Sequence, residues 1–245
     1  MTQRVIVLML GHRSLTGKDT GAEYLKQFGW QRMAFADKLK STVADLYNFS
    51  HSQMHGDLKD TEDLRYKNTV DEPYKFGYDE ASGEVLTWVP NDNYKPFFTP
   101  RRILQIFGQQ QRLLYPDIWA QYIFNQIDIR RGLSSNPTQI FKYVITDFRF
   151  KNEFEVAKRW AQTDVDGPVK VQKCIFPIKV DRNVVAKSGS QDISEHDLDS
   201  FGNWCGVIDN NGTIDDLHDR LSRLDNTFLK LILPSIADEI VEEFK

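Results

Sequence analysis

The 245-residue chain has only two cysteines, Cys174 and Cys205, too few for a disulfide framework and without metal-site spacing. Its formal net charge of −4 gives no excess that would indicate a nucleic-acid polymer or a membrane as partner. Long apolar runs are also missing: the run at residues 5–10 is too short for a signal peptide or a membrane span. Internal repeats and low-complexity tracts are absent. These absences favour a globular protein of the reducing cytoplasm.

What the chain does contain is an alternation of strand and helix patterns. The continuous apolar run at residues 5–10 predicts a buried parallel strand, and residues 142–147, 169–180 and 205–209 predict three more strands. Helical spacing of apolar residues lies between and after these runs, at residues 18–28, 35–47, 99–107, 116–127, 152–161 and 213–240. The alternation predicts an α/β fold with a parallel sheet covered by helices on both faces.

Residues 48–99 interrupt this pattern. They are polar, aromatic and rich in turn residues, and residues 84–89 predict one arm of a small hairpin. We interpret residues 48–99 as a small insert on a single domain that spans residues 1–245.

The sequence at residues 11–20, GHRSLTGKDT, joins the first predicted strand to the first predicted helix. Glycines let backbone N–H groups close around phosphate oxygens, and the start of a helix favours negative charge. Lys18 would bridge the β- and γ-phosphates of ATP. The alternative is a Gly-rich turn with a chance lysine. We prefer a phosphate-binding loop, because strand, loop and helix all agree.

Two features of this loop depart from the usual pattern. It holds one residue more between Gly11 and Gly17, and Asp19 stands where Ser or Thr is expected. A carboxylate cannot replace a neutral hydroxyl. We therefore expect Asp19 to hold Mg²⁺ through water, or Thr20 to take part of that role.

The strand predicted at residues 142–147 ends in Asp147, and Arg149 follows two positions later. Ligands of open α/β sheets bind at the carboxyl ends of the strands. Asp147 could order Mg²⁺ or its waters, and Arg149 could reach a phosphate. The alternative is a strand-end acid that caps a helix.

A basic helix is predicted after Thr99, which is its N-cap, with Pro100 in the first turn. Arg101, Gln105 and Arg112 lie within about 40° of one another at 100° per residue, so they share a face. With Arg102 they could hold the phosphate and base of a nucleotide. The alternative is a solvated helix face.

Charged residues flank a small, polar stretch at residues 186–190. Asp181 and Arg182 precede this stretch, and Ser194 and Glu195 follow it. This arrangement predicts a lid at about residues 181–197. A plain surface loop is the alternative.

Six segments are similar, in the same order, to segments of one kinase family. They are GKDT at 17–20, FADKLK at 35–40, RRILQIFG at 101–108 with the later Trp119, VITDFR at 144–149, Arg182 with the Ser194–Glu195 pair, and VIDNNGTIDDL at 207–217. By these segments the chain resembles the bacteriophage deoxynucleoside monophosphate kinases of the P-loop nucleoside-monophosphate-kinase superfamily.

The resemblance implies a P-loop NTPase fold and transfer of a phosphoryl group from ATP to a deoxynucleoside 5′-monophosphate, with Mg²⁺. The implied catalytic residues are Lys18, Arg149 and Arg182. Those implied for ATP are Gly11, Arg13, Thr16, Gly17, Lys18, Asp19 and Thr20. Those implied for the acceptor are Phe35, Ala36, Asp37, Lys40, Arg101, Arg102, Gln105, Arg112, Trp119, Asp147 and Arg149. Arg182, Ser194 and Glu195 would belong to the lid, and Asp19, Thr20 and Asp147 would hold Mg²⁺ through water.

Two other functions stay open on the sequence. A P-loop kinase could use another phosphorylated acceptor such as dephospho-coenzyme A, and an ATP-binding switch protein would transfer no phosphate to a small molecule. The arginines outside the loop disfavour the switch. The expected partners are ATP and a deoxynucleoside monophosphate, in the host cytoplasm if a phage encodes the chain. The bases accepted, the discrimination against ribonucleotides and the oligomeric state are not predicted, although kinases of this kind often form homodimers.

Overall fold

The computed structural model describes residues 2–78, 85–91, 94–164, 168–183 and 196–243, with the side chains of 74–78, 85–90 and 229–243 left aside. The chain divides into two compact units, one of residues 1–36 and 117–245 and one of residues 37–116. The single domain with an insert at 48–99 stays a prediction. None of the described helices is long and apolar enough to cross a bilayer.

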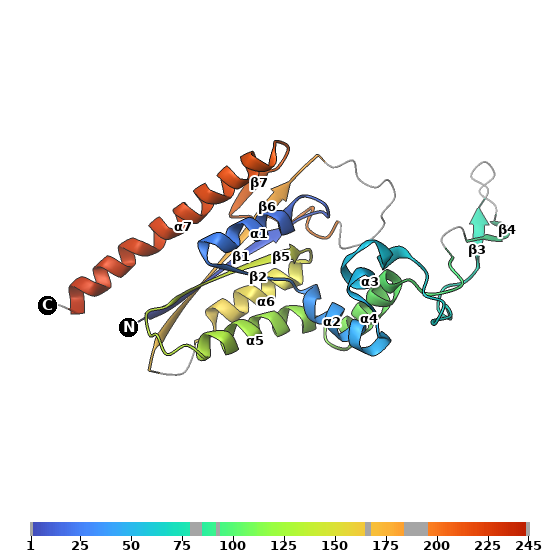
Figure 1. The fold of residues 1–245 in the computed structure, drawn as a ribbon, viewed down its shortest axis with the longest axis horizontal. Helices are drawn as coiled ribbons and strands as arrows, with labels where there is room; N and C mark the ends of the chain where they lie inside the picture. The colour runs from blue at the N-terminus through green and yellow to red at the C-terminus, as the bar shows by residue number, and fades with distance from the viewer. Residues whose placement is uncertain (1, 79–84, 92–93, 165–167, 184–195, 244–245) are drawn as a thin grey trace. The chain divides into compact units, whose positions relative to one another are not determined.

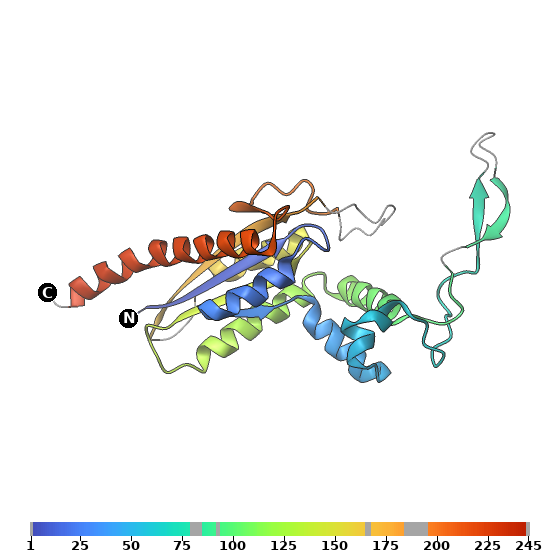
Figure 2. The same ribbon diagram turned by 45° about the horizontal axis from the view of Figure 1, so that its top comes forward.

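The first unit is built on a five-stranded sheet in the order β2–β5–β1–β6–β7, and every neighbouring pair is parallel. The strands are β1 (Thr2–Gly11), β2 (Trp30–Met33), β5 (Ile140–Phe148), β6 (Lys170–Asp181) and β7 (Gly206–Asp209). Figures 1 and 2 show α1 (Lys18–Leu25) and α7 (Ile214–Glu243) along one face, and α5 (Ile118–Gly132) and α6 (Lys151–Gln162) along the other. The fold is therefore the predicted α/β fold, with the sheet arrangement of a P-loop kinase.

Alternation along β1 explains how this sheet is buried on both faces, because successive side chains of a strand point to opposite sides. Ile6, Leu8 and Leu10 pack in one cluster with Leu25 of α1 and Leu221 of α7. Val5, Val7 and Met9 are fully buried as well. On the α5–α6 side, the rings of Phe124 and Trp160 lie 4.9 Å apart.

One strand was not predicted. The first helix continues as a 3₁₀ turn, η1 (Lys26–Phe28), and ends at Gly29, whose φ of 83° reverses the chain. Residues 30–33 then form β2 beside β5. Because β2 is only four residues long and includes Gln31 and Arg32, its sequence lacks an apolar run.

The second unit holds α2 (Ala36–Tyr47), α3 (His51–His55), η2 (Asp57–Asp60), the strands β3 (Tyr74–Tyr78) and β4 (Val85–Pro90), and α4 (Pro100–Leu114). Its core consists of Val43, Phe49, Met54, Ile103 and Leu104. The strands β3 and β4 pair antiparallel, which confirms the predicted hairpin. The predicted start of α4 is confirmed too, since the Thr99 hydroxyl accepts a hydrogen bond from the Arg102 backbone N–H at 3.1 Å.

Candidate active site

The carboxyl ends of the parallel strands lie at one edge of the sheet. Gly11 at the end of β1 is in register with Phe148 of β5 and Lys179 of β6, and Asp181 of β6 is in register with Asp209 of β7. The candidate phosphate-binding loop, residues 11–20, leaves this edge and enters α1. It therefore occupies the position at which open α/β sheets bind ligands.

The backbone of this loop changes the sign of φ repeatedly. His12, Leu15 and Gly17 have φ values of 88°, 59° and 92°, and the residues between them are on the ordinary negative side. Such alternation makes successive N–H groups converge into concave anion-binding nests. Positive φ is strained for His12 and Leu15, and strain of this kind is typical of functional loops. The extra residue thus belongs to a defined, tightly coiled loop.

Both glycines of the loop are closely surrounded. A Cβ on Gly17 would lie 2.3 Å from Nδ2 of Asn210, which donates a hydrogen bond to the Thr16 carbonyl at 2.8 Å. A Cβ on Gly11 would lie 2.6 Å from the Phe148 ring and 2.8 Å from the Trp204 ring. Asn210, which follows β7, and Trp204, which precedes it, therefore pack against the loop.

Lys18 begins α1 and is buried, with 6% of its surface exposed. Its ammonium donates hydrogen bonds to the carbonyl of His12 at 3.3 Å, to the hydroxyl of Thr16 at 3.1 Å and to the carbonyl of Arg13. The charge is thus enclosed by the loop that is expected to bind phosphate.

His12 adds a second ionisable group at the base of the loop. Its ring lies 3.8 Å from a carboxylate oxygen of Asp181 and 3.5 Å from one of Asp199, and Arg13 also pairs with Asp199 at 3.4 Å. Burial lowers the pKa of His12, aided by Lys179 and Arg13, while the two carboxylates act in the opposite direction. The ring is therefore neutral near pH 7, and it lies between the carboxylates of Asp181 and Asp199.

The carboxylates expected to hold Mg²⁺ differ in their exposure and in their hydrogen-bond partners. Asp19 is exposed in the first turn of α1, next to Thr20, and pairs with Arg32 at 3.2 Å. The two oxygens of Asp147 accept the backbone N–H groups of Phe35 and Ala36 at 2.7 and 2.9 Å. Within the described residues no group of three or more His, Cys, Asp or Glu could hold a metal. Asp19 fits an ion held mainly by phosphate and water.

The remaining predicted residues of the first unit lie at different depths. Arg149 follows β5 and is half-buried, and Arg182 follows β6 and is exposed. Trp119 in α5 is buried, with 7% of its surface exposed, and its part in base recognition stays a prediction. Ser194 and Glu195 lie outside the described residues, so their part in a lid stays a prediction.

In the second unit, the two arginines at the start of α4 form ion pairs. Arg101 binds Asp60 through two nitrogens, one of them at 2.9 Å, and Arg102 binds Asp71 in the same way. Arg102 holds the pKa of Asp71 below its usual range, mainly through its side-chain hydrogen bond. Gln105 and Arg112, further along α4, are half-buried.

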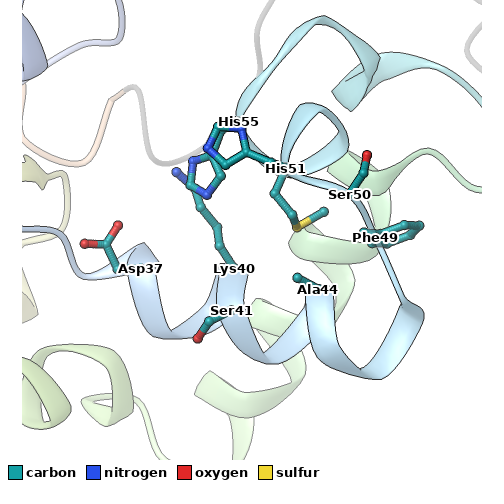
Figure 3. Close-up of a pocket in the computed structure, with 9 residues that line it drawn as sticks. Asp37, Lys40, Ser41, Ala44, Phe49, Ser50, His51 and His55 are labelled. Carbon is teal, nitrogen blue, oxygen red and sulfur yellow. The ribbon is translucent and has the colours of Figure 1, made fainter.

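A pocket of about 310 Å³ lies elsewhere in the second unit (Figure 3). Its lining includes two predicted acceptor residues of α2, Asp37 and Lys40. Its other lining residues are Ser41, Ala44, Phe49, Ser50, His51, Met54 and His55.

The sequence patterns did not reveal several residues of these sites. Asn210 falls in the segment 207–217 that carries the family resemblance, and this was the one signal that could have found it. Asp199 and Trp204 carry no motif, and their contacts with the loop come from distant parts of the chain. His51 and His55 lie in residues 48–99, outside the six segments that carry the family resemblance.

Comparison with known proteins gives a similarity to a viral protein. The chain is 28% identical over 229 residues to a protein of Acanthamoeba polyphaga mimivirus named "Putative deoxynucleotide monophosphate kinase". The match covers 91% of this chain and 97% of the relative. No protein-family model matches the chain.

Proposed function

We propose that this protein transfers the γ-phosphoryl group of ATP to the 5′-phosphate of a deoxynucleoside monophosphate. The observation that carries the proposal is the enclosed ammonium of Lys18 in a strand–loop–helix segment with alternating φ. The name of the mimivirus relative supports the acceptor class.

The chemistry of this transfer requires positioning and positive charge. The attacking group is an anionic phosphate oxygen, so no strong general base is needed, and the loose transition state spreads negative charge over the transferred group. Lys18 would hold the donor phosphates, while Arg149 and Arg182 would neutralise charge that develops during transfer. Mg²⁺, when bound, would neutralise the β- and γ-phosphates, with Asp19 as its protein carboxylate.

Asp147 acts in this scheme through the backbone. Its carboxylate fixes the N–H groups of Phe35 and Ala36, and thereby the start of α2. In this role Asp147 positions the backbone of Phe35 and Ala36, two residues of the predicted acceptor segment, and its carboxylate needs no direct contact with the ion.

Replacement of the loop lysine tests the reaction. Lys18→Met should lower kcat by roughly 10²–10³-fold, as expected when a preorganised cation is removed from the transferred charge. Lys26→Met is the matched control, since Lys26 lies at the end of the same helix and pairs with Glu23 on the surface. Release of ADP would be measured with each of the common deoxynucleoside monophosphates and with dephospho-coenzyme A.

The acceptor screen separates the rival functions. Turnover with deoxynucleotides supports the proposal, and turnover with dephospho-coenzyme A alone would replace it by another kinase reaction. Tight ATP binding without any acceptor-dependent ADP would indicate a switch protein. Unchanged turnover in Lys18→Met would remove Lys18 from the mechanism.

A further inference from the structure

The pocket of the second unit has two chemically different sides. Phe49 and Met54 are buried core residues and form, with Ala44, an apolar wall. Lys40, His51 and His55 lie at the other side, and Figure 3 shows the Lys40 side chain extending toward the two imidazole rings. An apolar wall with a few convergent polar groups is typical of a small-molecule site.

The two histidines form a preorganised pair. They stand four residues apart on α3, so their side chains share one face of the helix. Their ring centroids are 4.9 Å apart with 26° between the planes. Within the described residues, neither ring nor the Lys40 ammonium has a hydrogen bond or a carboxylate partner at ion-pair distance.

This lack of partners distinguishes Lys40 from the arginines of α4. Arg101 and Arg102 are each occupied by a carboxylate, Asp60 and Asp71 respectively. A phosphate group that bound to these arginines would have to displace an existing ion pair. A phosphate group that bound to Lys40 would gain a charge-assisted contact without that loss.

The size of the pocket limits the ligand. A volume of about 310 Å³ is at the lower end of the range for small-molecule sites. It suits a mononucleotide or a part of one, with an anionic group at the cationic side and a flat or apolar group against Phe49 and Met54.

We infer that Lys40, His51 and His55 bind the 5′-phosphate of the deoxynucleoside monophosphate acceptor, whose apolar part packs on Phe49 and Met54. The inference rests on the proposed function for the identity of the acceptor. Under this inference the acceptor phosphate is bound by a lysine–histidine cluster and not by the arginines of α4.

The charges around His55 make this site sensitive to pH. Burial is the main cause that lowers the pKa of His55. The charges of Lys40, His51 and Lys59 also lower this pKa, whereas the carboxylate of Asp37 raises it. The free ring is therefore mostly neutral at pH 7. A bound phosphate dianion favours the imidazolium, so binding takes up a proton and weakens as pH rises through the pKa of the occupied site.

The first test compares Michaelis constants at pH 6.5 and 8.5, above the second ionisation of the phosphate at about pH 6. The acceptor KM of the wild type should rise severalfold over this range, and that of His51→Asn/His55→Asn should stay flat. Lys40→Met should raise the acceptor KM roughly 10-fold at both pH values, the loss of one charge-assisted hydrogen bond, and leave the KM for ATP unchanged.

Matched controls separate these effects from general damage. Lys38→Met alters an exposed lysine two positions away on α2. His218→Asn removes a histidine that stacks on Tyr24, with ring centroids 3.8 Å apart, in the first unit. Neither control should change the acceptor KM, and thermal denaturation would verify that every variant is folded.

The second test measures binding without turnover. Calorimetry of dGMP and dTMP at pH 7.5, in buffers of different ionisation heat, should show proton uptake by the wild type and none by His51→Asn/His55→Asn. Turnover of deoxynucleotides with equal pH profiles in the wild type and the double variant would overturn the pocket assignment and leave the proposed function intact. If no deoxynucleotide is phosphorylated, the proposed function fails. Histidine-dependent proton uptake would then still support the pocket, and its absence would overturn that as well.

Discussion

Gly17 is the residue at which the backbone and its surroundings constrain the candidate loop together. Its φ of 92° disfavours any side chain, and the Asn210 amide lies 2.3 Å from where a Cβ would be. Gly29 provides a contrast, because its φ of 83° is similar but no atom lies within 4 Å of its Cβ position. A side chain at Gly29 would therefore cause backbone strain alone, whereas a side chain at Gly17 would cause both backbone strain and a steric clash.

Alanine substitutions at these positions should have unequal effects. Gly29→Ala should lower the free energy of unfolding by about 1 kcal/mol, the cost of a left-handed residue with a side chain. Gly17→Ala should lower it by about 2–3 kcal/mol, since the Asn210 amide must also leave the Thr16 carbonyl. Urea denaturation measures both losses. Equal losses would show that Asn210 moves aside without cost.

At the scale of elements, α7 is held to the sheet by a buried polar cluster as well as by apolar packing. Asp225 of α7 is 4% exposed and accepts hydrogen bonds from the indole N–H of Trp30 at 2.7 Å and from the Lys142 ammonium at 2.9 Å. The Lys142 ammonium also lies 5.5 Å from the centre of the Trp30 ring. One carboxylate thus connects α7 to both β2 and β5.

Removal of this carboxylate should be costly. Asp225→Ala should lower the free energy of unfolding by about 3 kcal/mol, because it leaves a buried ammonium and an indole N–H without their acceptor. Asp219→Ala, at an exposed position of the same helix, should change it by less than about 0.5 kcal/mol. Chemical denaturation compares the two variants. A loss below about 1 kcal/mol for Asp225→Ala would mean that apolar packing alone docks α7.

The sequence predicts those elements whose signals are local. The apolar run of β1 and the cap formed by Thr99 are local patterns, and the structure confirms both. The strand β2 has no such signal, because only its position beside β5 makes it a strand. The pairs of Arg101 with Asp60 and of Arg102 with Asp71 join residues 41 and 31 positions apart. A helical wheel shows the shared basic face of α4 but cannot show which carboxylates neutralise it.

For the whole molecule, the two units differ in the chemistry that they carry. The first holds the loop with its enclosed lysine, and the second holds the pocket with its lysine and two histidines. Each unit has its own apolar core. A donor site in one unit and an acceptor site in the other would let each nucleotide bind on its own.

Hydrogen–deuterium exchange can assign each nucleotide to its unit. A non-hydrolysable ATP analogue with Mg²⁺ should slow exchange at residues 11–20, and a deoxynucleoside monophosphate alone should slow it at residues 37–55, because a bound ligand suppresses local opening where it makes contact. Lys18→Met should abolish the first effect and keep the second. Lys40→Met should do the reverse, and Lys26→Met and Lys38→Met should preserve both. Slower exchange at residues 11–20 with the monophosphate alone, and none at 37–55, would place the acceptor at the loop and contradict a separate acceptor pocket.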